Sequence, residues 1–110
     1  MRSITPYSAD APKREEVDSR AGLVLLDFGT NWCGHCQAAQ QPVAEALAAH
    51  PDLHPIRVED GPGRPLGRSF RVKLWPTLIL LRDGREVARL VRPTESAAVA
   101  QWLAAGLAAS

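Results

Sequence analysis

Residues 23–36 read LVLLDFGTNWCGHC, and this stretch decides what kind of fold the sequence encodes. Residues 23–28 form a short apolar run with glycine on both sides, which is typical of a strand buried on both faces of a sheet. The Ala-rich residues 37–50 are helix-prone. Cys33 and Cys36, the two cysteines of the chain, therefore stand where a buried strand gives way to a helix.

The length and composition predict one globular domain that spans residues 1–110. The chain has 110 residues, of which 45% are hydrophobic, and this is a common size for a single domain. Its 13 basic and 12 acidic residues leave a formal net charge of +1, so the overall charge does not favour nucleic acid as a partner. A local basic patch is still possible, because four basic residues lie close together in the sequence: Arg64, Arg68, Arg71 and Lys73.

The sequence predicts neither a membrane span nor a disulfide scaffold. The N-terminus lacks the run of about 7–15 apolar residues of a secretory signal, and no stretch approaches the roughly 18 residues of a membrane span. We therefore expect a cytoplasmic protein without a membrane partner if the chain is full-length. A Cys33–Cys36 bridge would close a very small loop, and loop-closure stabilisation grows with loop length. Such a bridge is expected to serve chemistry rather than stability.

Alternating strand-like and helix-prone segments predict an α/β fold. Asp10 is the expected cap of the first helix, Pro42 should kink the second helix or begin another segment, and Asp83-Gly84 predicts a hairpin turn. Helices between the early strands imply parallel pairing, and the hairpin implies antiparallel pairing. We therefore expect a mixed central sheet of four to five strands flanked by helices on both faces. The predicted strands are 4–7, 23–28, 55–59, 77–81 and 87–91, and the predicted helices are 10–20, 37–50, a short segment ending near residue 70, and 95–108.

The C-x-x-C pair points to redox chemistry, because a thiolate at a helix start is a reactive nucleophile. Cys33 should lie at the helix N-terminus, where the helix dipole favours its thiolate, and a protonated His35 would add a positive charge beside it. Gly34 is expected to allow tight backbone packing around the sulfurs. Cys36 lies one turn further, so it should be more buried, start as a thiol and need a base. Asp27 is the candidate base, because burial raises the pKa of a carboxyl group toward values useful for proton transfer.

These residues, together with Trp75-Pro76-Thr77 and the Asp-Gly hairpin, resemble the thioredoxin superfamily over nearly the whole chain. A lone C-x-x-C is a weak signal, but the combination of these motifs is specific. The resemblance implies a thioredoxin fold, a cis bond before Pro76 with that proline packed against the sulfurs, and a Trp75 that borders the substrate groove and offers backbone hydrogen bonds to a partner. It also implies that Asp27 is the buried proton acceptor, and that Arg57 takes the place where a lysine often lies.

Several positions depart from the usual pattern of that superfamily. Gly29 stands where a large residue such as Trp is common, and Pro42 lies one residue further from Cys36 than usual. Trp75 is bulkier than the usual Ile, Val or Thr, and Arg92 falls where a groove-lining Gly is frequent. The Gly-His pair between the cysteines resembles the disulfide-isomerase type, which is about 90 mV more oxidising than thioredoxin. These departures bear on the partner rather than on the fold.

We therefore predict a bacterial thiol–disulfide oxidoreductase that exchanges a dithiol for a disulfide with protein substrates. No cofactor beyond the redox-active cysteine pair and no metal is expected, and we expect a monomer. The resemblance implies thioredoxin reductase as the electron source. The residues expected in catalysis are Cys33, Cys36, Asp27 and His35, with Arg57 in support of proton transfer, and those expected to bind the substrate are Trp32, Gly34, Trp75, Pro76, Thr77 and Arg92.

Other interpretations of the same residues stay open from the sequence. The cysteines could be half of a metal site that recruits His50 and His54, although structural zinc needs four ligands. Asp27 could be a solvent-facing or purely structural carboxylate, and Arg57 a solvated strand residue. The chain could also be a non-catalytic module that docks a partner through Trp32, Trp75 and Arg92, with the thiols incidental.

Overall fold

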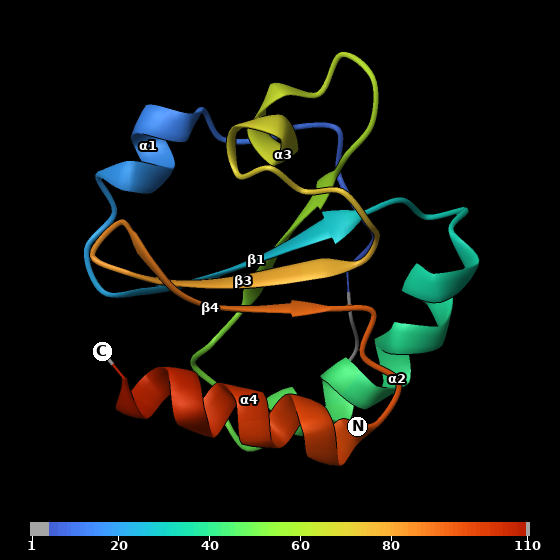
Figure 1. Ribbon diagram of the computed structural model, residues 1–110, viewed down its shortest axis with the longest axis vertical. Helices are drawn as coiled ribbons and strands as arrows, with labels where there is room; N and C mark the ends of the chain where they lie inside the picture. Colours follow the sequence, from blue (N-terminus) through green and yellow to red (C-terminus); the bar gives the residue numbers. More distant parts are fainter. Residues whose placement is uncertain (1–4, 110) are drawn as a thin grey trace.

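A mixed four-stranded sheet forms the centre of the fold in the computed structural model, which describes residues 5–109 (Figure 1). The strands are β1 (Leu23–Gly29), β2 (Pro55–Glu59), β3 (Thr77–Arg82) and β4 (Arg85–Val91), and the helices are α1 (Arg14–Asp18), α2 (Gly34–Leu47), α3 (Pro65–Ser69) and α4 (Ser96–Ala108). The spatial order is β2-β1-β3-β4, in which β1 pairs parallel with β2 and antiparallel with β3, and β3 pairs antiparallel with β4. No helix within residues 5–109 is long and apolar enough to cross a membrane.

Helices cover both faces of this sheet: α1 and α3 lie on one side, and α2 and α4 on the other (Figure 1). The alternation of side chains along β1 explains this arrangement, because successive residues of a strand point to opposite faces. Leu26 and Phe28 join a buried cluster with Val17 of α1, whereas Leu25 joins a second cluster with Leu103 of α4. The predicted mixed sheet with helices on both faces is therefore confirmed.

The strand predicted at residues 4–7 is not formed by the described part of that segment. Ile4 lies outside the described residues, and residues 5–7 have no strand structure. Ser8 instead makes a single parallel bridge to Val58 in β2. Two backbone hydrogen bonds make this bridge, from the Ser8 N–H to the Arg57 carbonyl over 3.1 Å and from the Glu59 N–H to the Ser8 carbonyl over 2.9 Å.

The first helix is shorter than the predicted segment 10–20, because α1 begins after Lys13 rather than after Asp10. Lys13 has extended backbone, and its N–H donates to the Glu16 carboxylate over 3.2 Å. Pro12 keeps Ala11 out of the helix, since a proline disfavours helical backbone in the residue that precedes it.

The cysteine motif lies at the start of the second helix as predicted, because Cys33 is the N-cap of α2 and Gly34 is already helical. Pro42 lies inside α2, which continues past it, so the proline does not begin another segment. The predicted hairpin between β3 and β4 is confirmed. Asp83 and Gly84 have φ angles of 51° and 81°, the left-handed geometry that a tight hairpin turn requires.

Candidate active site

The two cysteines lie at the start of α2, just beyond the C-terminal end of β1. Cys33 caps the helix, and the Cys36 N–H donates to the Cys33 Sγ over 3.2 Å. Both are free thiols, but Cys36 is 1% exposed whereas Cys33 is partly exposed. The structure therefore separates one accessible sulfur at the helix N-terminus from one buried sulfur inside the first turn.

The buried sulfur is held as a thiol at neutral pH. Burial raises the pKa of Cys36 to about 12, and its hydrogen bond with Cys33 acts in the same direction. The backbone of Thr30 and the hydroxyl of Tyr7 lower this pKa without cancelling the effect of burial. Because the thiolate is the species that attacks a disulfide, Cys36 needs a base close by.

The candidate base, Asp27, is buried in β1 and paired with Arg57 of β2. The two are partners in the parallel register, and the Arg57 Nε donates to Asp27 Oδ2 over 3.2 Å. Asp27 is 3% exposed and Arg57 is 5% exposed, so the interpretations as a solvent-facing carboxylate and a solvated arginine are wrong. Burial raises the pKa of Asp27, while the Arg57 charge and a hydrogen bond from Tyr7 oppose this shift.

Tyr7 completes this buried group, and sequence reasoning missed it. Its hydroxyl donates to Asp27 Oδ1 over 2.7 Å, and the Arg57 guanidinium lies 3.8 Å from the centre of its ring. Two hydrogen bonds with Asn31 hold its backbone: the Tyr7 N–H donates to Asn31 Oδ1 over 2.8 Å, and Asn31 Nδ2 donates to the Tyr7 carbonyl over 3.1 Å. The N-terminal segment is thereby fastened to the loop that carries the cysteines.

Gly29 leaves the space that Tyr7 occupies beside the buried sulfur. A Cβ at Gly29 would lie 2.6 Å from Cys36 Sγ and 2.8 Å from the ring and hydroxyl of Tyr7. Tyr7, Asp27, Cys36 and Arg57 line a common cavity that has no room for a water molecule. The small residue at position 29, where the superfamily commonly has a large one, was therefore the sequence signal for this contact. The single tyrosine of the chain comes from another segment and fills the space that a large residue would occupy.

The peptide bond between Trp75 and Pro76 is cis, as the resemblance implies. The register pairs Thr77 with Phe28, which places Pro76 at the end of the sheet from which the cysteine loop leaves. Thr77 is 1% exposed, and its hydroxyl donates to the Leu74 carbonyl over 2.6 Å. Its side chain therefore holds this loop together and does not face a partner.

Arg92 is bonded to the two residues of the cis peptide. Its Nε donates to the Trp75 carbonyl over 2.9 Å, and its N–H donates to the Pro76 carbonyl over 2.9 Å. Its φ of 51° is left-handed, which explains why glycine is frequent at this place in the superfamily. The carbonyl of Trp75 is thus satisfied within the chain, although the resemblance implies that the backbone of Trp75 serves a partner.

Three of the expected residues face outward around the accessible sulfur. Trp32 is 70% exposed, and His35 is exposed on the first turn of α2. A Cβ at Gly34 would meet no atom within 4 Å, so the expected tight packing at this glycine is wrong. Gly34 instead leaves open space next to Cys33.

Two neighbouring thiols that differ this much in exposure are suited to thiol–disulfide exchange. The more exposed thiol attacks a disulfide, and the buried thiol resolves the mixed disulfide that forms. Within residues 5–109, no group of three or more His, Cys, Asp or Glu side chains is placed so that it could hold a metal ion. The fold and the site together define a thiol–disulfide oxidoreductase.

Comparisons with known proteins place the chain within this class. The family model for thioredoxin matches residues 7–105, and the chain belongs to the thioredoxin family. The structure of thioredoxin 2 from Pseudomonas aeruginosa PAO1 in its reduced form is 54% identical, with a TM-score of 0.86, and the match covers 96% of this chain and 98% of that one. Thioredoxin from Chlamydia trachomatis is 47% identical over 73 residues, which are 64% of this chain and 70% of that protein. Thioredoxin from Mycobacterium tuberculosis is 35% identical over 104 residues, 93% of this chain and 89% of that protein.

These similarities confirm the predicted family, fold and oxidoreductase activity. Nothing in them supports the alternative of a non-catalytic binding module.

Proposed function

We propose that the chain reduces protein disulfides in two steps, with a separate sulfur for each step. The Cys33 thiolate attacks one sulfur of the substrate disulfide, so that a Cys33–substrate disulfide forms and the first substrate thiolate leaves. The Cys36 thiolate then attacks the Cys33 sulfur, which releases the second substrate thiolate and leaves a Cys33–Cys36 disulfide. The substrate gains the two electrons that the cysteine pair loses. The difference in exposure between Cys33 and Cys36 is the observation that carries this order.

In this proposal, Tyr7 relays the proton from Cys36 to the base. The Cys36 proton passes to the Tyr7 oxygen as the Tyr7 proton passes to Asp27, so that Cys36 becomes a thiolate and Asp27 a neutral acid. Two observations support this path. Tyr7 donates a 2.7 Å hydrogen bond to Asp27. Tyr7 and Cys36 Sγ both lie within 2.8 Å of the position that a Cβ on Gly29 would take. The cavity that these groups share does not admit a water molecule that could take the role of the hydroxyl.

The other residues position this machinery or face the partner. Arg57 holds the Asp27 carboxylate in place. His35 is exposed on the first turn of α2, two residues after Cys33. The partner-facing surface consists of Trp32, Gly34, Trp75 and Arg92, whereas Pro76 is buried beneath it.

We further propose protein disulfides as substrates, thioredoxin reductase as the electron donor, and the cytoplasm as the compartment. The similarity to bacterial thioredoxins supports these assignments. Reduction of a protein disulfide at the expense of NADPH and a bacterial thioredoxin reductase tests the partners. Cell fractionation tests the compartment.

Two serine substitutions test the order of the sulfurs. Cys33→Ser should abolish reduction of a protein disulfide, because no accessible thiolate remains. Cys36→Ser should still attack and should accumulate a disulfide between Cys33 and the substrate, which mass spectrometry detects. Full activity of Cys33→Ser would overturn the assignment.

The double serine variant separates catalysis from simple docking. It should form no covalent complex with any disulfide substrate. If it retained every partner that the wild type captures, while the wild type reduced no protein disulfide, the non-catalytic module would be the better account.

A further inference from the structure

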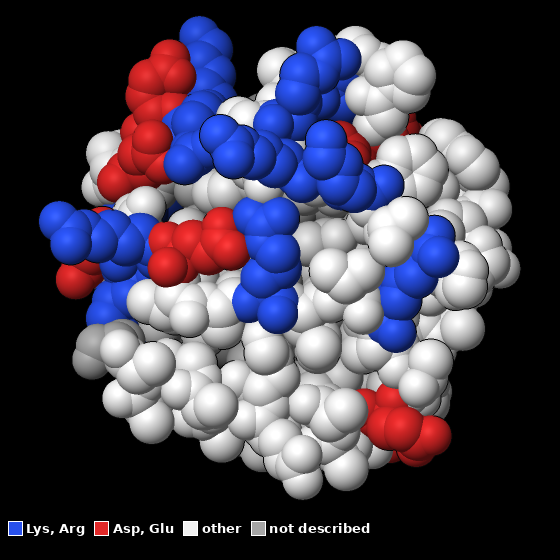
Figure 2. Space-filling view, in the orientation of Figure 1, with Lys and Arg blue, Asp and Glu red and all other residues white. Residues whose placement is uncertain are grey.

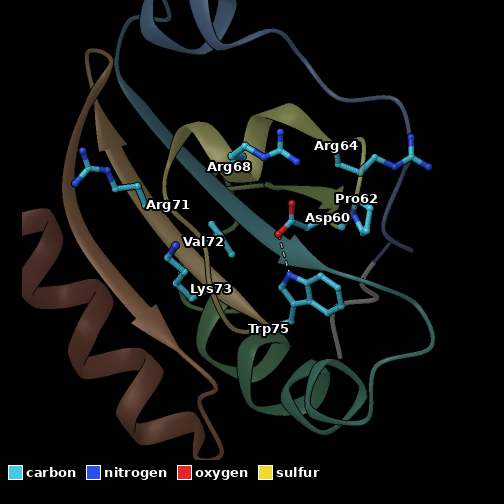
Figure 3. A pocket seen from close by; sticks show the side chains of 9 residues that line it. Asp60, Pro62, Arg64, Arg68, Arg71, Val72, Lys73 and Trp75 are labelled. Carbon is cyan, nitrogen blue, oxygen red and sulfur yellow. Dashed lines mark hydrogen bonds between the residues drawn. The ribbon is translucent and has the colours of Figure 1, made fainter.

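A hollow of about 440 Å³ opens beside Trp75 and lies outside the dithiol site (Figure 3). Its walls come from the loop after β2, from α3, and from the residues that lead to the cis-proline. The Trp75 indole forms one wall, where its Nε1 donates to Asp60 Oδ2 over 2.8 Å. The hollow therefore shares Trp75 with the surface that the proposed function assigns to the substrate. Four basic side chains stand around it: Arg64, Arg68, Arg71 and Lys73.

Most of this positive charge is not neutralised. Arg64 pairs with Glu59 over 2.6 Å. Arg68, Arg71 and Lys73 are exposed, and their side chains have no hydrogen bond or ion pair with the described residues 5–109. Figure 2 shows Lys and Arg gathered where α3 lies in Figure 1, with acidic and basic side chains mixed over α1, whereas few charged side chains lie over α4. Since the net charge of the chain is +1, the basic character is a local property of this region.

The backbone of Arg71 has a left-handed conformation that glycine usually adopts. The end of α3 is closed by two hydrogen bonds, from the Arg71 N–H to the Arg68 carbonyl and from the Val72 N–H to the Gly67 carbonyl, each over 3.0 Å. In this type of helix end the residue after the cap is left-handed, and Arg71 has a φ of 59°. An arginine there costs backbone energy that glycine would not, which sets this charge apart from an ordinary surface arginine.

We infer that this hollow docks an acidic segment of the protein whose disulfide is exchanged at Cys33, an inference that rests on the proposed function. A single exposed ion pair contributes little, so one small anion would gain little here. Several carboxylates on one chain can engage Arg68, Arg71 and Lys73 together. A segment that belongs to a substrate already bound at the sulfurs meets these cations at a high effective concentration.

A nucleic acid fits the same region less well. The carboxylates of Glu59 and Asp60 stand at or beside the hollow and would repel a continuous polyanion. The near-neutral net charge gives no long-range attraction for a phosphate backbone. A peptide segment can place its acidic residues against the cations and leave uncharged residues elsewhere.

Two synthetic peptides with the same internal disulfide test the inference, one flanked by a run of glutamates and the other by glutamines. The wild type should reduce the acidic peptide with a kcat/KM about tenfold higher at low ionic strength, and salt should remove the difference. The Arg68→Gln/Lys73→Gln variant should lose this preference. Arg20→Gln/Arg85→Gln is the matched control, because it removes two exposed charges near the opposite end of the sheet, where Leu23 pairs with Arg82. This control should keep the preference.

Arg71→Gly provides a variant whose folding is not at risk. Glycine suits the left-handed backbone, so the midpoint of unfolding should not fall, while the preference for the acidic peptide should be reduced. All the variants should reduce a small uncharged disulfide at the rate of the wild type, since they leave the cysteines and Asp27 unchanged.

Equal kcat/KM values for the two peptides in the wild type would overturn the inference, as would an equal loss of preference in the control Arg20→Gln/Arg85→Gln. An oligonucleotide that competes for the hollow more strongly than a free acidic peptide of equal charge would overturn the choice of a protein segment. A wild type that reduces the small disulfide but neither peptide would overturn the inference and leave the dithiol chemistry intact. A wild type that reduces no disulfide at all would overturn the proposed function itself.

Discussion

Replacing Tyr7 with phenylalanine removes one hydroxyl from the buried group beside Cys36 and leaves the ring in place. That hydroxyl donates the 2.7 Å hydrogen bond to Asp27, and a hydrogen bond to a charged group contributes about 1.5–3 kcal/mol. Because about 1.4 kcal/mol corresponds to a tenfold change in rate, the step in which Cys36 attacks should slow by about 10–100-fold. The first attack uses the partly exposed Cys33 and does not involve this proton, so its rate should not change.

A chromogenic aromatic disulfide separates the two steps in a single turnover. The attack by Cys33 releases one coloured thiolate, and the attack by Cys36 on the resulting mixed disulfide releases a second. Stopped-flow absorbance of reduced wild type and Tyr7→Phe should therefore show equal fast phases and a slower second phase in the variant. The double variant Asp27→Asn/Tyr7→Phe should be no slower than Asp27→Asn, because a relay has no function once its base is gone.

The pH dependence distinguishes a relay from a loss of packing. Burial holds the pKa of Cys36 at about 12, so more of the thiolate forms without a base as the pH rises toward that value. The difference between wild type and Tyr7→Phe should therefore shrink between about pH 7 and about pH 10. A second phase that is unchanged in Tyr7→Phe, or slowed by the same factor at every pH, would refute the relay.

Other substitutions at the site have expected outcomes of their own. Burial raises the pKa of Asp27 in the folded chain above its usual 3.8, so the free energy of unfolding should fall as the pH rises above that value. Asp27→Asn should remove this fall, which urea denaturation at several pH values measures. Gly29→Ala should lower the free energy of unfolding by about 1–3 kcal/mol in the same assay, since its Cβ would stand 2.6 Å from the buried sulfur. Arg92→Gly frees the Trp75 carbonyl, and should lower the KM for a protein disulfide while leaving that for a small disulfide unchanged, as steady-state kinetics can show. His35→Pro should shift the reduction potential of the cysteine pair toward about −270 mV, measured by equilibration with glutathione and followed by tryptophan fluorescence.

The parts of the fold that follow from local pattern could be predicted from the sequence. The apolar run of β1 and the turn at Asp83 and Gly84 lie where strand and turn preferences place them. The cysteine pair at the helix start and the cis bond before Pro76 also agree with the motifs that carry them. The strand and the turn depend on neighbouring residues, so local pattern is enough to specify them, whereas the cis bond was implied by the resemblance to the thioredoxin superfamily.

Long-range contacts decided the rest of the site. Tyr7 lies 20 residues before Asp27 in the chain, and nothing in its neighbourhood marks it as a partner of that carboxylate. The hollow beside Trp75 exists because three segments meet there.

The sequence by itself determined the class of protein, the two sulfurs and the carboxylate that we propose as their base. The tertiary structure alone decided that Tyr7 lies beside both the buried sulfur and that carboxylate. It also decided that three cations without a hydrogen-bond or ion-pair partner among residues 5–109 line a hollow next to the cis-proline loop. The physical reason is that backbone preferences act between near neighbours, whereas burial, the exclusion of water and the summing of charge arise only when distant segments pack together.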